Sequence, residues 1–201
     1  MIKVLLFDAD GVTITPPGYG STYAAQQAGL GVTDLQSFFT KEFVACKQGK
    51  ADLKVEIQPY LNRIGWKKSV DEFLQTWFAY ENVVDERMFV EIKELRNKGV
   101  FCALTTDQEK YRKDFLLYEM NFQEKFDLLY VSSDIGFSKQ EQDYFLYVFS
   151  DVNTKRIVQK DEVLLIDDTP HVIDAAKEFG IHAELYKEFS DFEKIKDTYN
   201  L

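Results

Sequence analysis

Five short apolar runs, most of them separated by helical patterns, place the strongest constraint on how this chain can fold. The first four are nearly continuous in apolar character, which is typical of strands buried on both faces. A repeated strand–helix–strand order predicts a parallel sheet with right-handed crossovers. We therefore predict an α/β core of the Rossmann-like, three-layer α/β/α kind, with a parallel five-stranded sheet. The expected strands are residues 4–7, 100–104, 128–131, 163–166 and 183–186.

Helical patterns follow one another through the second half of the chain. In residues 86–98, three apolar side chains (Phe89, Ile92 and Leu95) fall on one face, and Gly99 provides a typical helix end. The other helices expected in this half are residues 110–120, 140–149 and 170–179.

One region interrupts this alternation. The turn-rich linker TPPGYG at residues 15–20 follows the first strand, and the next sixty residues have helical patterns and no strand pattern. We predict a core of residues 1–14 and 83–201 and a helical cap of residues 15–82, inserted at the carboxyl end of the first strand. The expected cap helices are residues 23–28, 35–43, 51–64 and 70–80.

Composition limits the function classes. The net charge of −10 argues against a nucleic-acid binder, and no apolar run approaches the roughly 20 residues of a membrane span. No signal-peptide pattern is visible and the two cysteines are isolated, so we expect a reduced, cytoplasmic protein. Residues 41–68 are locally basic. This is the pattern of a solvated helical face or, alternatively, of a patch that faces an anionic substrate.

Polar residues gather where the predicted strands end. In open α/β sheets, ligands bind beyond the carboxyl ends of the strands. Four of the five predicted strands would thus deliver carboxylates, hydroxyls and a lysine to one edge of the sheet. These residues are Asp8 and Asp10 after the first strand, Thr105 and Thr106 at the second, Lys139 after the third, and Asp167 and Asp168 at the fourth.

The charges at this edge predict a metal ion. Residues two apart in an extended segment point the same way, so Asp8 and Asp10 would share a side. Like charges this close raise each other's pKa unless a cation intervenes, and Mg²⁺ typically takes carboxylates, waters and a substrate phosphate. Of Asp167 and Asp168, we expect one to bind the ion directly and the other through water.

The remaining groups suit a phosphate. Thr105 offers a hydroxyl, backbone amides near Thr106 add donors, and Lys139 offers a point charge. A metal, a lysine and a carboxylate together indicate phosphoryl transfer to an aspartate nucleophile. The chain has no glycine-rich nucleotide loop, which weakens kinase and dehydrogenase interpretations.

The motifs FDADGV, LTTD, SK and LLIDDTPHVIDAAKEFG occur here in the order and spacing of the haloacid dehalogenase superfamily. The chain resembles this family over its whole length, and the helical insert resembles its helical-cap subclass. It is similar to the subgroup that holds small sugar-phosphate phosphatases and β-phosphoglucomutase. The resemblance implies a Mg²⁺-dependent phosphatase that hydrolyses a small phosphomonoester.

The resemblance also implies a role for each motif residue. Asp8 would be the nucleophile that becomes an aspartyl-phosphate, and Asp10 the general acid and then base, with its backbone carbonyl on the metal. Thr105 would bind the transferring phosphoryl group, and Lys139 would bridge nucleophile and phosphate. Asp167 and Asp168 would hold Mg²⁺. The family's dehalogenases lack the second aspartate, so its presence favours phosphate chemistry.

Three positions depart from the family pattern. Gln140 and Gln142 stand where prolines usually follow the lysine, which predicts a less rigid lysine loop. Val172 replaces an Asn or Asp common after the paired aspartates, which predicts a different outer sphere around the metal.

The choice among related activities stays open at this level. A phosphomutase would use the same residues and pass the phosphoryl group to a sugar hydroxyl. A non-catalytic phosphometabolite-binding protein is the alternative from another class. In the cap, Arg63 in the segment NRIGWKK is a candidate for selecting a second polar group of the substrate. The expected partner is a small phosphorylated metabolite, with no nucleic acid or membrane, and the sequence allows a monomer or a dimer.

Overall fold

The structure, a computed structural model, describes residues 1–31 and 33–201. Its centre is a five-stranded, wholly parallel sheet with the strand order β3-β2-β1-β4-β5, which confirms the predicted fold class. The central strand β1 pairs through Leu5 with Cys102 on one side and with Leu164 on the other. The strands are β1 Val4–Phe7, β2 Phe101–Thr106, β3 Leu128–Val131, β4 Val163–Asp167 and β5 His182–Leu185.

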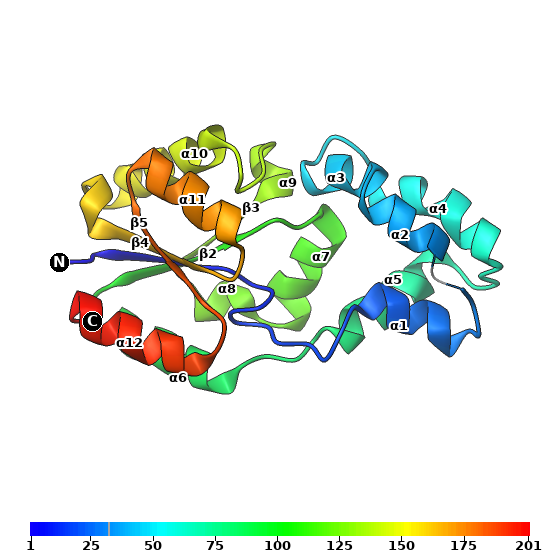
Figure 1. Ribbon diagram of the computed structural model, residues 1–201, viewed down its shortest axis with the longest axis horizontal. Coiled ribbons are helices and arrows are strands. Elements are labelled where there is room, and N and C mark those ends of the chain that lie inside the picture. Colours follow the sequence, from blue (N-terminus) through cyan, green and yellow to red (C-terminus); the bar gives the residue numbers. More distant parts are fainter. Residues whose placement is uncertain (32) are drawn as a thin grey trace.

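Helices cover both faces of this sheet, as Figure 1 shows. Leu5 and Phe7 point into an apolar cluster with helices α6, α8 and α12, whereas Val4 and Leu6 point into a second cluster with α10 and α11. This alternation follows from the two-residue period of a strand. The core helices are α6 Glu86–Asn97, α7 Lys110–Asp114, α8 Phe122–Lys125, α9 Ser132–Ile135, α10 Gln142–Lys155, α11 Pro170–Phe179 and α12 Phe189–Tyr199.

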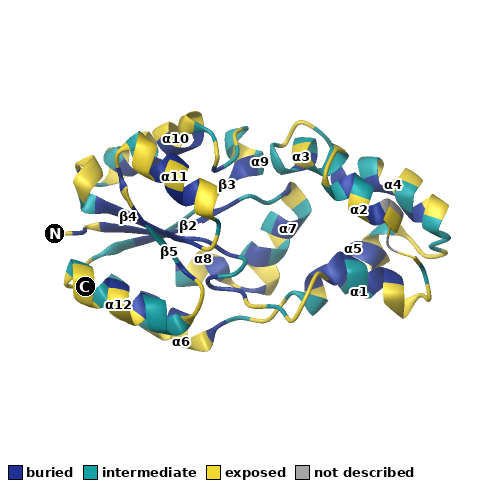
Figure 2. Ribbon diagram, viewed as in Figure 1, coloured by how far each residue is buried: buried dark blue, intermediate teal, exposed yellow. Residues whose placement is uncertain are grey.

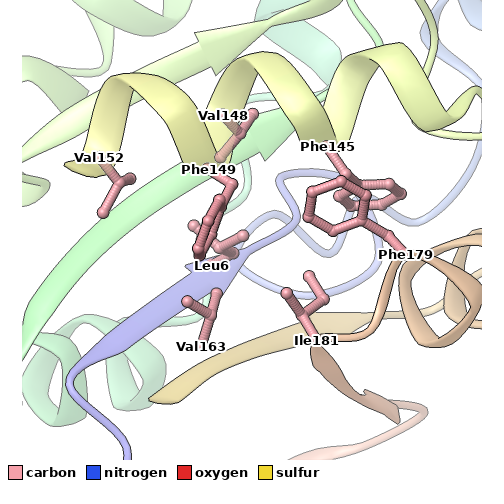
Figure 3. A pocket seen from close by; sticks show the side chains of 8 residues that line it. All are labelled: Leu6, Phe145, Val148, Phe149, Val152, Val163, Phe179 and Ile181. Carbon is pink, nitrogen blue, oxygen red and sulfur yellow. The ribbon is translucent and has the colours of Figure 1, made fainter. Parts of the chain in front are cut away.

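The second apolar cluster contains a small gap between α10, α11 and the sheet, shown in Figure 3. Its volume of about 10 Å³ is at the lower limit for a single water molecule. The side chains around it are all apolar, so it is a packing defect of the core and offers nothing for recognising a ligand. They are Leu6, Phe145, Val148, Phe149, Val152, Val163, Phe179 and Ile181.

The helices between β1 and α6 pack around an apolar cluster of their own, and they form the right half of Figure 1. Aromatic rings dominate this cluster, with Phe38, Phe73 and Trp77 buried at its centre. The cluster supports the proposed cap of residues 15–82, whose boundaries stay a prediction. The cap helices are α1 Gly20–Gln27, α2 Thr33–Phe39, α3 Glu42–Lys47, α4 Leu53–Ile64 and α5 Val70–Tyr80.

Local signals explain where several helices begin and end. The side chain of Asp52 accepts a hydrogen bond from the amide of Lys54 at the start of α4, and Gly65 ends this helix with φ +86°. Ser69 and Glu72 form a reciprocal capping box at the start of α5. These capping interactions satisfy helix-end groups that would otherwise lack partners.

Two strands extend further than the apolar pattern predicted. Strand β2 includes Thr105 and Thr106, and β4 includes Asp167, because backbone pairing with β3 and β5 continues through these polar residues. Ladder hydrogen bonds depend on the backbone and not on side-chain polarity. The candidate residues therefore sit on rigid strand ends.

Two predicted helices differ in form. Residues 110–120, predicted as one helix, are α7 followed by the π-helical segment η1 (Phe115–Glu119). The predicted cap helix 35–43 is divided between α2 and α3. Helix α10 begins two residues later and ends six residues later than residues 140–149. None of the helices in the described part of the chain is long and apolar enough to cross a membrane.

Candidate active site

Asp8 directly follows the central strand, and a tight turn fixes it there. Its backbone amide donates to the carbonyl of Ile166 in β4 (3.0 Å), which continues the sheet pairing by one residue. The amides of Thr13 and Ile14 both donate to the carbonyl of Ala9, so the chain folds back immediately after Asp8. Asp8 is 6% exposed, and the Ala9 amide donates a hydrogen bond to Oδ1 of its carboxylate at 2.7 Å.

Lys139 lies between two of the predicted carboxylates. Its Nζ lies 2.6 Å from Oδ1 of Asp8 and 2.7 Å from Oδ2 of Asp167, and it also donates to the carbonyl of Thr105 at 3.4 Å. All four residues are buried. Burial alone would lower the pKa of the Lys139 ammonium, but Asp8 and Asp167 outweigh this effect and raise its pKa. The lysine is therefore a permanent positive charge at the strand ends.

Three carboxylates at the same edge form a group that suits a divalent cation. Asp8, Asp167 and Asp168 each offer an oxygen, and these oxygens lie within 4.8 Å of one another. A set of carboxylate oxygens fits Mg²⁺, which prefers hard oxygen ligands. The predicted contribution of the Asp10 backbone carbonyl to this ligand set stays a prediction.

Gly11 makes the close approach of Asp168 possible. Its φ is +83°, and a Cβ added there would collide with the Asp168 carboxylate. The glycine in the motif DADG is therefore required by space as well as by backbone conformation.

Asp10 is brought near Asp8 by the turn and not by strand alternation. Strand β1 ends at Phe7, so the two-residue argument that predicted a shared side does not apply to residues 8–10. The Nε2 amide of Gln108 donates a hydrogen bond to Oδ2 of Asp10. Burial raises the pKa of the Asp10 carboxyl, against the opposing charges of Arg112 and Lys139. A carboxyl with a raised pKa is suited to donating a proton.

Thr105 and Thr106 lie at the end of β2, and both are buried. The Thr105 hydroxyl donates to the carbonyl of Phe7 at 3.3 Å, across the β1–β2 pair. A hydroxyl has a single proton, so Thr105 would have to exchange this partner in order to donate to a phosphate oxygen. Its role in phosphate binding, and that of the amides near Thr106, stay predictions.

The loop that carries Lys139 is held by polar contacts where the family pattern has prolines. The Lys139 amide donates to Asp107 (3.0 Å), and the Glu141 carboxylate accepts from the Ser138 amide (2.7 Å) and hydroxyl (3.1 Å). The side chain of Gln142 reaches the carbonyl of Ala175 in α11 (3.0 Å). These contacts oppose the expectation of a looser loop.

Two residues at the start of α11 bear on the predicted metal site. Val172 is buried in the second apolar cluster, so this position packs against the core. Thr169 occupies the N-cap position before Pro170, but its hydroxyl donates to Asp168 instead of capping the helix. The hydroxyl therefore helps to orient a predicted metal ligand.

Arg63 is placed in the last turn of α4, and its guanidinium lies 5.1 Å from the ring centroid of Tyr60 in the same helix. The start of α4 is close to the core, because Asp52 pairs with Lys110 at 2.6 Å. At about 1.5 Å per residue, Arg63 lies roughly 15 Å further along the helix axis. The role of Arg63 in substrate selection stays a prediction.

Sequence reasoning missed three residues around the site. Gln108 binds Asp10, and Glu141 closes the turn around Lys139. Arg112 is 2% exposed, and its charge acts on Asp10 from α7. Gln108 and Glu141 are close to motif residues in sequence, which was the available signal. No sequence pattern singles out Arg112 as a buried arginine.

Comparisons with known proteins agree with this geometry. The sequence model of the family described as haloacid dehalogenase-like hydrolase matches residues 50–185, a region that contains Thr105, Lys139, Asp167 and Asp168 but not the first strand. No curated protein matches the chain in sequence.

Solved structures share the fold at low sequence identity. A predicted HAD-like family hydrolase from Porphyromonas gingivalis is similar with a TM-score of 0.80 and 20% identity, over 97% of this chain and 98% of that chain. A HAD family enzyme from Bacteroides thetaiotaomicron, in complex with magnesium and inorganic phosphate, has a TM-score of 0.80 and 18% identity, over 96% and 99%.

A third similar structure is L-2-haloacid dehalogenase from Xanthobacter autotrophicus, with a TM-score of 0.68 and 17% identity, over 100% of this chain and 83% of that chain. The family match spans more than half of the sequence and includes the motifs of three strand ends. The chain therefore belongs to the haloacid dehalogenase-like hydrolase family.

Proposed function

We propose that this hydrolase is a Mg²⁺-dependent phosphatase that acts on a small phosphomonoester, such as a sugar phosphate. The observation that carries the proposal is the pairing of a buried Asp8–Lys139–Asp167 ion cluster with a second carboxyl, Asp10, whose pKa is raised by burial. The first provides an oriented nucleophile, and the second provides a proton.

In the first half-reaction, the Asp8 carboxylate attacks phosphorus and the bond from phosphorus to the ester oxygen breaks. The amide of Ala9 and the ammonium of Lys139 share Oδ1 of Asp8, so we assign the attack to Oδ2. The Asp10 carboxyl gives its proton to the leaving oxygen, which departs as an alcohol. The product on the protein is an aspartyl-phosphate at Asp8.

In the second half-reaction, the Asp10 carboxylate takes a proton from a water molecule as that water attacks the phosphorus. The bond from phosphorus to the Asp8 oxygen breaks, which releases inorganic phosphate and restores both carboxyl groups. Gln108 would hold the Asp10 side chain toward the site through both steps.

Asp8, Asp167 and Asp168 are the groups that would hold Mg²⁺. A bound Mg²⁺ would supply positive charge to the phosphate oxygens and would offset the mutual repulsion of the carboxylates. Lys139 supplies a further positive charge from the protein itself.

The leaving group distinguishes this proposal from a dehalogenase activity. An alkoxide needs a proton to leave, whereas a halide does not. The intact Asp10 therefore supports phosphate chemistry, although one similar fold is that of L-2-haloacid dehalogenase. The complex of a similar structure with magnesium and inorganic phosphate also supports it.

The test is hydrolysis of an aryl phosphate by the purified chain, with Mg²⁺ and with a chelator. We expect metal-dependent turnover that Asp8→Asn abolishes. Asp134→Asn is the matched control. Asp134 follows strand β3 at the same edge of the sheet, but its side chain is exposed and forms an ion pair with Lys113. Undiminished turnover by Asp8→Asn would refute the mechanism.

Assays with hexose 1-phosphate and with a broad panel of phosphorylated ligands separate the other activities. A phosphomutase would convert hexose 1-phosphate into hexose 6-phosphate with little free phosphate. A binding protein would retain phosphorylated ligands without hydrolysing any of a broad panel.

A further inference from the structure

The cap contacts the core directly beside the loop that carries Lys139. Gln48 follows α3 in the cap, and its Nε2 amide donates to Oε2 of Glu141 in the core at 2.8 Å. The contact joins residues 93 positions apart in sequence. It is therefore a contact between the cap and the core, and it depends on where the cap sits.

The same Glu141 oxygen closes the turn that holds Lys139. Oε2 accepts from the Ser138 amide at 2.7 Å and from the Ser138 hydroxyl at 3.1 Å. The Glu141 amide in turn donates to the Ser138 carbonyl at 2.9 Å. Lys139 lies within this turn, so the conformation of the turn sets the point from which the lysine side chain extends.

Neighbouring contacts fix the position of this part of the cap on the core. The Ser132 hydroxyl donates to the carbonyl of Lys47 at 2.6 Å. Gly49 has φ +67° and packs so closely on the Ser133 carbonyl that a Cβ would collide with it. Residues 47–49 are therefore packed against the core. This packing places the Gln48 side chain within hydrogen-bonding distance of Glu141.

The turn needs such a contact because its sequence does not stiffen it. A proline fixes φ near −65° and lowers the freedom of a loop, whereas Gln140, which lies within the turn, places no such restriction on its backbone. The carboxylate of Glu141 supplies the constraint through hydrogen bonds, and Gln48 holds that carboxylate in its orientation.

We infer that Gln48 and Glu141 are positioning residues, which make the placement of Lys139 depend on the seating of the cap. When the Gln48 amide binds Glu141, the turn is fixed and Lys139 extends between Asp8 and Asp167. The inference rests on the proposed function only for its effect on turnover; the coupling itself is a property of the contacts.

The first test is hydrogen–deuterium exchange of the amides in residues 138–141, which needs no substrate. We expect Gln48→Ala to speed this exchange by about tenfold, because a charge-assisted hydrogen bond to the turn is lost. Gln58→Ala is the matched control, since Gln58 is a cap glutamine that bonds to Asn62 within α4. Equal exchange in the two variants overturns the inference.

The second test compares two substitutions at position 48. Gln48→Glu places two carboxylates face to face, and we expect kcat for an aryl phosphate to fall about tenfold or more. Gln48→Lys keeps a hydrogen-bond donor toward Oε2 of Glu141 and leaves the Ser138 contacts of that oxygen intact, so we expect it to retain most of the rate. A Gln48→Lys variant as slow as Gln48→Glu contradicts the coupling.

The two tests also separate this inference from the proposed function. Absence of turnover by the unmodified chain on any phosphomonoester refutes the phosphatase proposal. The exchange measurement still decides whether Gln48 acts on the turn.

Discussion

Arg112 is a buried charge at the junction between the cap and the core. It is 2% exposed, and its guanidinium donates to the carbonyls of Phe78 (3.1 Å) and Glu81 (3.4 Å) at the end of α5. The Glu81 carboxylate lies 3.8 Å away, and the rings of Phe78 and Phe115 flank the charge at 5.4 and 5.3 Å. Glu81 also accepts from the Gly20 amide, so both linkers of the cap meet here.

Arg112→Met keeps the length of the side chain and removes these interactions. Breaking a buried, hydrogen-bonded charge pair typically costs about 3–5 kcal/mol. Helix-end carbonyls near a cation add to this value, because the C-terminus of a helix carries partial negative charge. With a urea m-value of about 2–3 kcal/mol/M, the expected loss shifts the unfolding midpoint down by about 1–2.5 M.

The measurement is urea unfolding followed by circular dichroism. Lys68→Met is the control, because the Lys68 and Glu72 side chains are 66% and 51% exposed in their ion pair. A surface pair of this kind contributes about 0–1 kcal/mol. If Arg112→Met lowers the midpoint no more than Lys68→Met, then the buried arginine does not stabilise the junction.

Three further changes test other parts of the structure. Gly11→Ala should weaken Mg²⁺ binding, measured by calorimetry, by about tenfold or more, because the added Cβ would displace Asp168. Gly99→Ala is the control and should leave Mg²⁺ binding unchanged, because Gly99 also has a positive φ but its added Cβ would meet open space. Gly49→Ala should lower stability by about 1 kcal/mol more than Gly99→Ala does, because only the former meets the core. Burial raises the pKa of Glu109 to about 7, so its contribution to stability is complete below pH ~4.5 and is lost as pH rises to about 7. The free energy of unfolding of Glu109→Gln, relative to that of the unmodified chain, should therefore rise by about 3 kcal/mol between these pH values. A difference in unfolding free energy that does not change with pH would contradict the assignment.

The sheet was predictable because the continuous apolar sequence of its strands indicates burial on both faces. The runs around Leu5, Cys102 and Leu164 are apolar on both faces, and only a parallel sheet covered by helices on two sides buries such runs. Because the strands were expected to be parallel, the polar residues at their carboxyl ends were expected at one edge of the sheet. The ends of the strands were less predictable, because Thr106 and Asp167 pair through their backbones despite polar side chains.

The residues that surround the motifs were not predictable in the same way. Gln108 and Asp10 meet across 98 positions, and Gln48 and Glu141 across 93. Gln108, Gln48 and Glu141 are ordinary polar residues of a turn or helix end until the fold brings their partners near. Periodicity reports which face of an element is buried, but it holds no information on such pairs.

The buried charges at the strand ends indicate why the site needs its surroundings to be fixed. Lys139 lies between Asp8 and Asp167 at distances that leave little room for another arrangement, and a displaced ammonium would leave two buried carboxylates facing each other. An uncompensated buried charge is costly, so the cluster is stable only when the turn carrying Lys139 is correctly placed. The chain has no proline in that turn, and the constraint comes from Asp107, Glu141 and, through Glu141, from the cap. The electrostatic stability of the core site therefore depends on the seating of the cap. A substitution of Gln48 should change the placement of Lys139, although the two side chains are not in contact.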